Sequence, residues 1–274
     1  MVSGDEEIAE RVLRRVLEGT NYMRMDLPPP YMGRQIHRII REVTHSTDPY
    51  AEIKRRSTDT ALKLYERVSA SVRNAPDPFS AAVRFAIAGN VMDYALASAW
   101  DAERIESCIG DALTVAVDEE AIGALRDAAI GASSILFIGD NAGETVFDRI
   151  LIERLPEGLV TYAVKGSPVI NDAIREDAEA AGIGHVARIV DTGSDAPGTI
   201  LELCSPDFCE IFDTAGLVIA KGQANIETLH RCARDVFFLT QVKCPVIARS
   251  LGNEVGDWLV EYWQPEPNTV PTAM

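Results

Sequence analysis

Long apolar runs, basic residues and paired cysteines are all scarce in this sequence of 274 residues. No apolar run approaches the roughly 20 residues that a membrane-spanning helix needs, so we expect no membrane partner. The first residues, MVSGDEEIAERV, are acidic and amphipathic and do not have the form of a signal peptide. These absences predict a cytoplasmic protein.

Basic residues are outnumbered, with 26 lysines and arginines against 42 aspartates and glutamates, for a formal net charge of −16. Binding to a nucleic-acid backbone requires clustered basic residues, so we expect no nucleic-acid partner. A small anionic substrate is still compatible with this charge, because a local site can be positive on an acidic protein.

The five cysteines include no C-x-x-C pair and show no spacing typical of a zinc site. Reduced, structural thiols are the simplest interpretation. Cys204 and Cys209 lie close enough in sequence to pair if oxidised, and the sequence does not decide between the two states. The four histidines form no motif, which favours surface or structural roles for them.

The first half of the chain has the apolar spacing of helices. This spacing occurs at Glu6–Leu17 and Tyr31–Val43, and helix starts are indicated at Asp48-Pro49 and Asp77-Pro78. The last of these runs into a strongly apolar segment, Phe79 to Trp100. We predict a helical domain over residues 1–131.

From about Ala132, short apolar runs alternate with helical stretches. The predicted strands are Ile135–Ile138, Leu159–Val164, His185–Ile189, Phe208–Phe212 and Leu217–Ala220. The predicted helices are Glu144–Leu155, Ile170–Ala181 and Thr199–Cys204. This alternation predicts an α/β domain over residues 132–263, with a mostly parallel sheet covered on both faces, and then a flexible tail at 264–274.

The most informative stretch is Ser134 to Ile150, where a predicted buried strand is followed at once by Asp140 and Asn141. Ligands in open α/β sheets lie outside the carboxyl ends of the strands, near the free N–H groups of a helix N-terminus. Carboxylate and amide oxygens are also ligands that hard divalent cations prefer. The alternative is that these side chains only cap the next helix.

Two further predicted strands end in polar residues. Lys165 follows the second strand, and Asp172, a little further on, is either a second carboxylate of the site or a helix cap. Lys221, Gly222 and Asn225 follow the strand that ends at Ala220, and a glycine turn there lets backbone N–H groups approach a phosphate.

Three other polar residues stand out against apolar sequence. Asn90 and Asp93 fall in the most apolar helical segment, where buried polar groups cost free energy unless they are paired. They are either satisfied locally or presented across a cleft to the sheet. Lys243 lies between apolar runs and either reaches the surface or faces a phosphate.

One chemistry explains these residues together. Two carboxylates and an amide can hold an octahedral cation, while lysines and glycine-turn N–H groups suit a phosphate. A metal held there can polarise phosphoryl oxygens and lower the pKa of a bound water. The sequence therefore predicts hydrolysis of a phosphate ester.

The chain resembles the DUF89 proteins, also called damage-control phosphatases, and among them the archaeal-type branch. The matching motifs, between about Arg34 and Trp258, are Asp48–Glu52, Gly89–Tyr94, Gly139–Glu144, Asn171-Asp172, Ala220–Asn225 and Lys243-Cys244-Pro245. The resemblance implies a helical N-terminal domain packed on a three-layer α/β/α domain. Archaeal-type members usually open with a C-x-x-C pair, which this chain does not show.

The resemblance also implies a site. Asp140, Asn141 and Asp172 would hold Mn²⁺, Mg²⁺, Co²⁺ or Ni²⁺, and small phosphorylated metabolites such as sugar phosphates would be the substrates. Phosphate and substrate contacts would come from the Lys221–Asn225 turn and from Lys243, and we expect Asn90, Asp93 and Lys165 to join them. In another branch an Arg-Thr pair precedes the late lysine, where this chain has Thr240 and Gln241.

The sequence bears on three alternatives to a metal-activated water. A phosphorylated aspartate of the haloacid-dehalogenase type needs a second aspartate where Ala142 stands. A cofactor-dependent transferase, such as a methyltransferase, would carry a G-x-G-x-x-G loop, whose spacing Gly139–Gly143 lacks. A non-catalytic protein that binds phosphometabolites or nucleotides would bind without turnover. We prefer a metal-activated water, with Asp140 as a metal ligand.

Overall fold

The computed structural model describes residues 6–90 and 110–265. The N-terminal helices are α1 (Glu6–Gly19), α2 (Pro29–Thr44), α3 (Ala51–Asn74), α4 (Pro78–Gly89) and α6 (Glu119–Gly131). The strands are β1 (Ile135–Ile138), β2 (Val160–Val164), β3 (Arg188–Asp191), β4 (Leu217–Lys221), β5 (Val236–Gln241) and β6 (Trp258–Trp263). The helices among the strands are α7 (Thr145–Ile152), α8 (Arg175–Ala180), α9 (Pro206–Thr214), α10 (Gln223–Leu229) and α11 (Pro245–Leu251).

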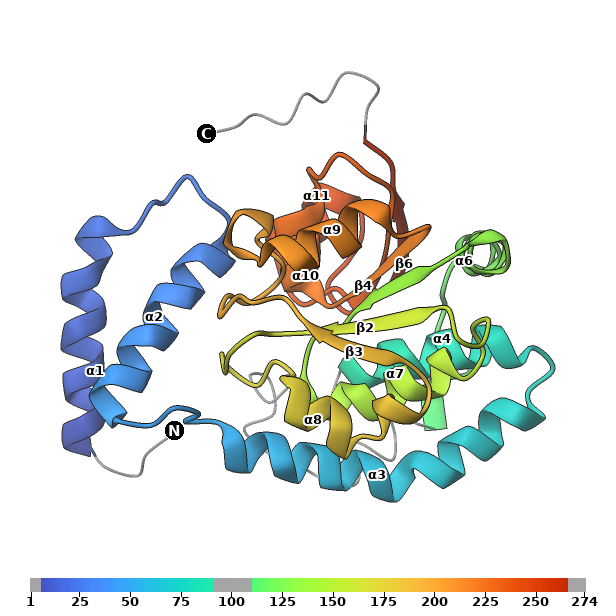
Figure 1. The fold of residues 1–274 in the computed structure, drawn as a ribbon, viewed down its shortest axis with the longest axis horizontal. Helices are drawn as coiled ribbons and strands as arrows, with labels where there is room; N and C mark the ends of the chain where they lie inside the picture. Colours follow the sequence, from blue (N-terminus) through green and yellow to red (C-terminus); the bar gives the residue numbers. More distant parts are fainter. Residues whose placement is uncertain (1–5, 91–109, 266–274) are drawn as a thin grey trace.

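The six strands form one sheet in the order β3-β2-β1-β4-β5-β6 (Figure 1). The first five are parallel and β6 is antiparallel to β5, which confirms the predicted mostly parallel sheet. The chain winds outward from β1 to β3 and then crosses to the other side of β1 to form β4. The point between β1 and β4 is therefore a topological switch point, where such sheets bind ligands.

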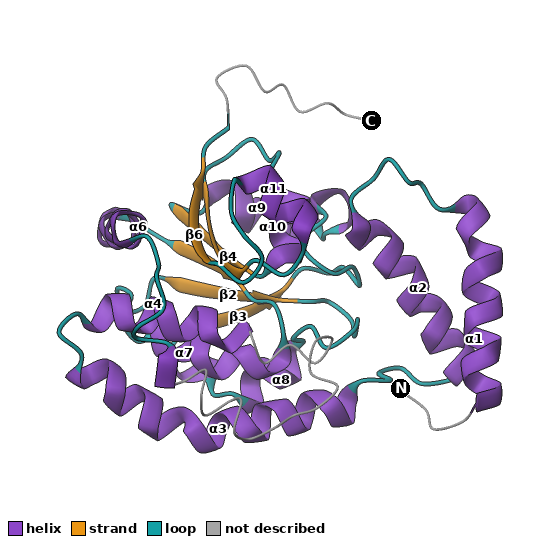
Figure 2. Ribbon diagram, turned by 180° about the vertical axis from the view of Figure 1, so that it is seen from behind, coloured by secondary structure: helices purple, strands orange, loops and turns teal. Residues whose placement is uncertain are grey.

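Helices cover both faces of the sheet, as Figures 1 and 2 show. Because side chains alternate along a strand, Ile135 and Phe137 of β1 join the apolar cluster of α3, α4 and α7. Leu136 and Ile138 join the opposite cluster, which includes Phe208 of α9 and residues of α10 and α11. The sheet is thus the middle layer of an α/β/α arrangement.

The N-terminal helices differ in how they are buried. Val68 of α3 and Phe85 of α4 belong to the same apolar cluster as Phe137 of β1 and Phe147 of α7. The core thus continues across the domain boundary predicted at residues 131 and 132, and that division stays a prediction. Helix α1 contributes no buried residue and packs on α2, so the pair forms a hairpin at one side of the molecule (Figure 1).

The helix start predicted at Asp77-Pro78 has a clear physical cause, whereas the helix after Asp48-Pro49 begins only at Ala51. Asp77 caps α4, because its Oδ1 accepts hydrogen bonds from the N–H groups of Phe79 at 3.0 Å and Ser80 at 3.1 Å. Pro78 occupies the first turn of that helix. The predicted continuation of this helix to Trp100 lies outside the described residues after Asn90.

The strand predicted at Phe208–Phe212 is wrong, because this segment lies in helix α9. The side chain of Ser205 caps that helix by accepting a hydrogen bond from the N–H of Phe208 at 3.2 Å, and Pro206 occupies its first turn. Phe208 and Phe212 are four residues apart, so they lie on one helical face. Strands β5 and β6 were not among the predicted strands.

Three predicted elements are shorter than expected. Strand β3 begins at Arg188 rather than His185, and the helix predicted at Thr199–Cys204 is a 3₁₀ turn at Leu201–Leu203. Helix α8 begins at Arg175 rather than Ile170, whose φ is 45°. The residues after Ile170 instead bond their backbone to the loop after β1.

Two absences hold for residues 6–90 and 110–265. None of the helices there combines the length and the apolarity needed to cross a membrane. The cysteines in these ranges are free, including Cys204 and Cys209. The Sγ atoms of these two cysteines donate hydrogen bonds to the carbonyl oxygens of Ile200 and Leu201, respectively.

Candidate functional site

Parallel register brings the polar residues at three strand ends together. Ile138, the last residue of β1, pairs with Ala163 of β2 and with Ala220 of β4. The residues that follow these three positions therefore meet at the same edge of the sheet. Asp140 and Asn141 thus lie near Lys165 and Gly222 at the switch point.

Asp172 reaches the same edge through an extended segment rather than a helix. The N–H of Ala173 donates to the carbonyl oxygen of Asp140 at 2.7 Å, and Asn141 forms an isolated antiparallel bridge with Asp172. Asp140, Asn141 and Asp172 are 7%, 5% and 4% exposed. The structure thus brings together the three side chains predicted to bind a metal.

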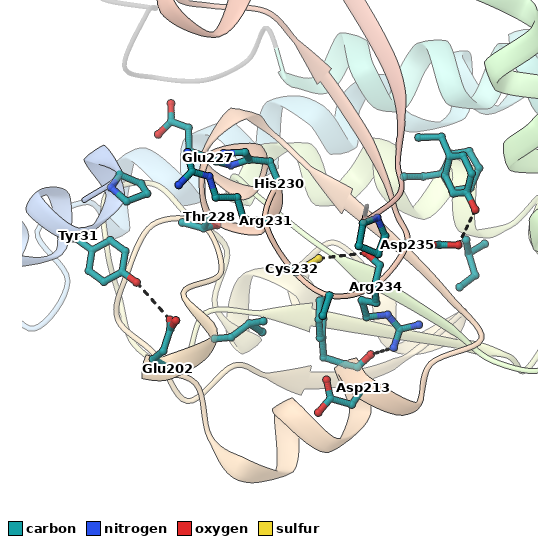
Figure 3. Close-up of a pocket in the computed structure, with 18 of the residues that line it drawn as sticks. Tyr31, Glu202, Asp213, Glu227, Thr228, His230, Arg231, Cys232, Arg234 and Asp235 are labelled. Carbon is teal, nitrogen blue, oxygen red and sulfur yellow. Dashed lines mark hydrogen bonds between the residues drawn. The ribbon is translucent and has the colours of Figure 1, made fainter. Parts of the chain in front are cut away.

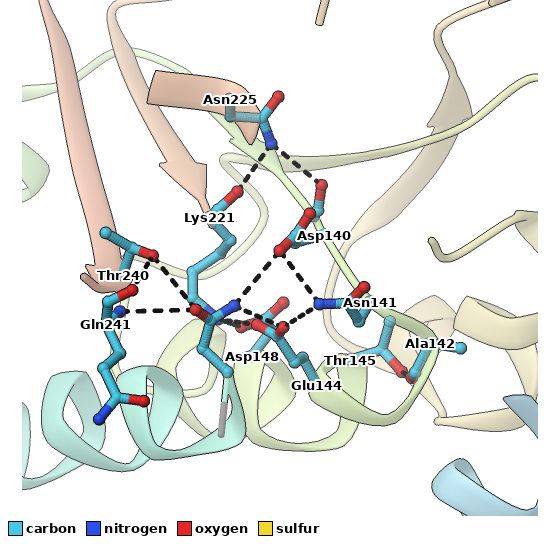
Figure 4. A network of polar contacts seen from close by, with 12 residues as sticks. Asp140, Asn141, Ala142, Glu144, Thr145, Asp148, Lys221, Asn225, Thr240 and Gln241 are labelled. Carbon is cyan, nitrogen blue, oxygen red and sulfur yellow. Dashed lines mark hydrogen bonds and ion pairs between the residues drawn. The ribbon is translucent and has the colours of Figure 1, made fainter. Parts of the chain in front are cut away.

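Asn90, at the end of α4, forms hydrogen bonds with the loop after β1, whose residues Asp140 and Glu144 are labelled in Figure 4. Its Nδ2 donates to Glu144 Oε1 at 2.6 Å and to Asp140 Oδ2 at 3.3 Å, while Thr240 Oγ1 donates to Asn90 Oδ1 at 3.1 Å. Asn141 Nδ2 donates to the same two carboxylate oxygens, at 2.6 and 3.1 Å. The helical region thus presents Asn90 to the sheet. Asp93 lies outside the described residues.

Lys221 has partners other than the predicted phosphate. Its Nζ donates to Asp148 Oδ1 at 2.6 Å and to Glu144 Oε2 at 3.0 Å, and Tyr162 OH donates to Asp148 Oδ2 at 2.7 Å. All four residues are fully buried. The ammonium group is therefore enclosed in the protein core, where it pairs with two carboxylates.

Burial and neighbouring charges shift the pKa values of Lys221 and Asp148. Burial lowers the pKa of Lys221, but the nearby carboxylates Asp148 and Glu144 raise it by more than burial lowers it. The net pKa of Lys221 therefore lies above its usual value. Burial also raises the pKa of Asp148 to about 6, with Glu144 adding to the effect and Lys221 opposing it.

Lys165 and Asn225 also have internal partners. Lys165 Nζ donates to the carbonyl oxygen of Gly198 at 2.5 Å and lies 3.5 Å from Asp172 Oδ2. Asn225 Nδ2 donates to the carbonyl oxygen of Lys221 at 2.7 Å, and its Oδ1 accepts a hydrogen bond from Thr199 at 2.7 Å. Both residues were predicted to contact phosphate. In the structure their side chains bind the loops around the site, and Lys165 also pairs with the carboxylate of Asp172.

A cleft of about 280 Å³ opens above the metal-ligand candidates. Asp140, Asn141, Asp172 and Lys243 line it, so Lys243 is the predicted phosphate contact that faces the cleft. The rest of the lining is Pro29, Pro30, Gly33, Ile170, Asn171, Pro197, Gln223, Ala224 and Glu227. The start of α2 thus covers the carboxylates, and the space left suits a small ligand.

The charges around the cleft favour a bound cation. Four buried carboxylates gather near the end of β1 and face two buried ammonium groups: Asp140, Glu144, Asp148 and Asp172 against Lys165 and Lys221. Lys243, which also lines the cleft, adds a third positive charge near Asp140, so one negative charge stays unbalanced. Burial, together with Glu144 and Asp172, raises the pKa of Asp140 well above its usual value. A divalent cation would offset this excess of negative charge.

The donor atoms fit such a cation. Asn141 uses its amide nitrogen on two carboxylates, which leaves its carbonyl oxygen for a ligand beside Asp140 and Asp172. Within the described ranges no three His, Cys, Asp or Glu side chains are grouped to hold a metal. The candidate set is of another kind, because its third oxygen comes from an amide.

Gly222 allows β4 to approach this site closely. Its φ is 81° and its ψ is 159°, a conformation that is almost exclusive to glycine. A Cβ atom at this position would overlap the carboxylate of Asp140. Position 222 must therefore be glycine for Asp140 to keep its place.

We expect Gly222→Ala to displace the Asp140 carboxylate and to destabilise the fold by at least about 2 kcal/mol, because backbone strain and steric overlap add. Urea unfolding would measure the free energy of unfolding. Gly252→Ala is the matched control, since Gly252 has a φ of 72° but no atom within 4 Å of its Cβ position. Equal costs for the two variants would contradict the close approach to Asp140.

Some residues of the site were missed from the sequence. Asp148 follows Glu144 by four residues and so lies on the same helical side, within an otherwise apolar pattern. Two carboxylates on a buried helical face require a cationic partner. This pattern is the sequence signal that could have assigned Lys221 to Glu144 and Asp148. Gln223 and Glu227 were also missed: Gln223 Nε2 donates to Glu227 Oε1 at 2.8 Å, and both line the cleft.

A larger cavity of about 1000 Å³ lies elsewhere, between the start of α2 and the helices α9 and α10 (Figure 3). Several of its polar groups are paired with each other or with the backbone. Tyr31 OH donates to Glu202 at 3.3 Å, and the guanidinium of Arg234 donates to the carbonyl oxygens of Phe212 and Ala215. Its lining does not include the carboxylates at the switch point.

The protein has an α/β fold with an oxygen-rich cleft, a candidate ligand site, at the switch point of its sheet. The model of one family, the damage-control phosphatase ARMT1-like domain, matches residues 2–259. The chain therefore belongs to this family, which confirms the resemblance to the DUF89 damage-control phosphatases.

Relatives from archaea support this assignment. The chain is 34% identical over 229 residues to a damage-control phosphatase of Pyrococcus horikoshii, which covers 81% of this chain and 77% of that protein. It is 29% identical over 269 residues to a damage-control phosphatase of Archaeoglobus fulgidus, which covers 95% and 92%. An uncharacterized protein of Methanocaldococcus jannaschii is 35% identical over 240 residues, which covers 84% and 78%.

The fold also matches a solved structure. The crystal structure of a DUF89 family protein from Pyrococcus horikoshii superimposes with a TM-score of 0.85 and 31% sequence identity. The match covers 96% of this chain and 92% of that one. The α/β architecture with N-terminal helices is therefore that of the family.

Proposed function

We propose that the protein is a metal-dependent phosphatase that hydrolyses small phosphorylated metabolites such as sugar phosphates. The observation that carries the proposal is the meeting of Asp140, Asn141 and Asp172 in a cleft that Lys243 also lines. Membership in the damage-control phosphatase family supports the reaction class. The surplus of buried carboxylates supports a cationic cofactor, for which Mn²⁺, Mg²⁺, Co²⁺ and Ni²⁺ are the candidates.

In this proposal the side chains have distinct roles. A divalent cation held by Asp140, Asn141 and Asp172 supplies positive charge to phosphoryl oxygens and lowers the pKa of a water. Asn90 orients Asp140 through its 3.3 Å hydrogen bond, and Lys165 orients Asp172 from 3.5 Å. Lys243 supplies a cationic contact for the phosphate from the edge of the cleft.

The position of Ala142 bears on the alternative of a phosphorylated aspartate. Ala142 is 1% exposed and stands two residues after Asp140, where that mechanism needs an acidic side chain. Asp140 itself accepts hydrogen bonds from Asn90 and Asn141 on one carboxylate oxygen, an arrangement suited to a ligand that is held in a fixed direction. We therefore assign Asp140 to the metal rather than to covalent catalysis.

Release of inorganic phosphate tests the function directly. The protein would be treated with a chelator and assayed with a panel of sugar phosphates and an aryl phosphate, before and after addition of each of the four metals. We expect release only with added metal. Binding of sugar phosphates by folded protein without release under any of these conditions would contradict a phosphatase and favour a metabolite-binding protein.

A further inference from the structure

Three arginines of α2 converge on one aspartate beside the catalytic cleft. Arg34 Nε lies 2.6 Å from Asp195 Oδ1, Arg38 Nε lies 2.6 Å from Oδ2, and Arg41 Nη2 lies 2.7 Å from Oδ2. Arg38 adds a second bond, from Nη2 to Oδ1 at 2.9 Å. The three arginines are spaced by four and three residues, which places them on one face of the helix.

This cluster carries more positive charge than its single carboxylate balances. Burial raises the pKa of Asp195, but hydrogen bonds from the three arginines lower it by more than burial raises it. The net pKa therefore lies well below its usual value, and the carboxyl group is ionised. Three guanidinium groups against one carboxylate leave two positive charges on a chain whose net charge is −16. The carboxylate of Glu42 acts on Arg38 and offsets part of this positive charge, although it is exposed and also accepts a hydrogen bond from Arg15 at 3.3 Å.

The arginines also keep unused hydrogen-bond donors. Arg34 gives Asp195 its Nε, so its two terminal amino groups remain available, and Arg38 keeps Nη1. The Asp195 carboxylate already accepts four hydrogen bonds and has no capacity for more. If the cluster only held α2 in place, one bidentate arginine would serve, and the remaining charge and donors would have no partner.

An open groove of about 600 Å³ lies over this cluster. The three arginines line it together with Glu42, Asp195 and three residues that carry hydroxyl groups, Ser46, Thr47 and Ser167. Arginine forks and hydroxyl donors are the groups that bind phosphate oxygens. The volume is that of a metabolite-sized site.

We propose that this groove binds a small multivalent anion that carries a phosphate group, at a site separate from the catalytic cleft. The cleft is lined by the first turn of α2, whereas the groove is lined by the later turns of the same helix. Gly33, next to Arg34, packs so closely on Pro197 that a Cβ atom there would lie 3.2 Å from the proline ring. An anion in the groove would therefore contact the same helix whose first turn lines the cleft.

Calorimetric titration with inorganic pyrophosphate tests the site without reference to activity. The full chain is used with a chelator present and at low salt, because added salt screens exposed charges. We expect saturable binding by the wild-type protein. Arg38→Gln and Arg34→Gln should each raise the dissociation constant at least about tenfold, since each removes a charge-assisted contact.

Two controls decide the location. Arg55→Gln alters an exposed arginine that pairs with Glu52 and Asp59 on its own helix, and it should leave pyrophosphate binding unchanged. Lys243→Gln alters the cleft, where the carboxylates of Asp140 and Asp172 repel an anion while the chelator withholds the metal, so it should also leave pyrophosphate binding unchanged. Either of two results overturns the proposal: no saturable binding to the wild type, or binding that Lys243→Gln abolishes while both groove variants, shown to be folded, retain it.

Discussion

Asp140→Asn is expected to reduce metal-dependent phosphate release by about 10³-fold. A metal ion stabilises the charge of a phosphoryl transition state by several kcal/mol, and each 1.36 kcal/mol corresponds to a factor of ten. The substitution keeps the shape of the side chain and an oxygen that Asn90 and Asn141 can donate to. It removes the negative charge on which the proposed metal site depends. Steady-state release of phosphate would measure the loss.

The same variant has a readout that does not depend on activity. Burial, Glu144 and Asp172 raise the pKa of Asp140, so its ionised form costs free energy in the folded protein near pH 7 when no metal is bound. Without metal, Asp140→Asn should therefore be at least as stable as the wild type. With Mn²⁺ at 100 times its dissociation constant, only the wild type should gain about 2.7 kcal/mol.

Asp191→Asn is the matched control for this prediction. Asp191 also lies at the carboxyl end of a parallel strand, but its side chain is exposed and pairs with Arg175 at 3.3 Å. It should leave both phosphate release and stabilisation by metal unchanged. If Asp140→Asn kept full activity, or gained the same stability from Mn²⁺ as the wild type, Asp140 would not be a metal ligand.

The metal-ligand candidates were predictable because parallel strands impose a simple geometry. An apolar run that stops at Gly139 and is followed by Asp140 and Asn141 fixes both the strand and the edge of the sheet where its polar residues emerge. The site needs only this local pattern and the rule that ligands lie at carboxyl ends of strands. The same reasoning placed Lys165 and Lys221 at that edge.

The direction of a side chain at that edge could not be predicted in the same way. A lysine after a strand has the same sequence pattern whether it points into the cleft or beneath it, and Lys221 points to Glu144 and Asp148 of the next layer. The strand predicted at Phe208–Phe212 was wrong for a related reason, since a short apolar run fits a strand or a buried helix equally. Contacts such as Arg34 with Asp195 join residues 161 positions apart, which no local pattern indicates.

Lys221→Met should lower the free energy of unfolding by about 4 kcal/mol at pH 7. Removing one partner of a buried ion pair leaves an uncompensated charge, and here two fully buried carboxylates, Glu144 and Asp148, lose their common cation. The pKa of the Asp148 carboxyl, which burial already raises to about 6, should rise further. A raised pKa in the folded state contributes stability at low pH that is lost as pH rises, so the deficit should shrink toward pH 5. Urea unfolding at several pH values would measure it.

Lys54→Met provides the comparison that isolates burial of the carboxylates. Lys54 is as buried as Lys221 and also pairs with two carboxylates, Asp48 at 2.7 Å and Asp177 at 2.8 Å. Those side chains are 15% and 14% exposed, so water can solvate them when the lysine is removed. The cost of Lys54→Met should therefore be smaller.

Adding Asp148→Asn to Lys221→Met should recover part of the lost stability, because one unpaired charge disappears. A double variant no more stable than Lys221→Met alone would show that packing, rather than the buried charge, sets the cost at position 221.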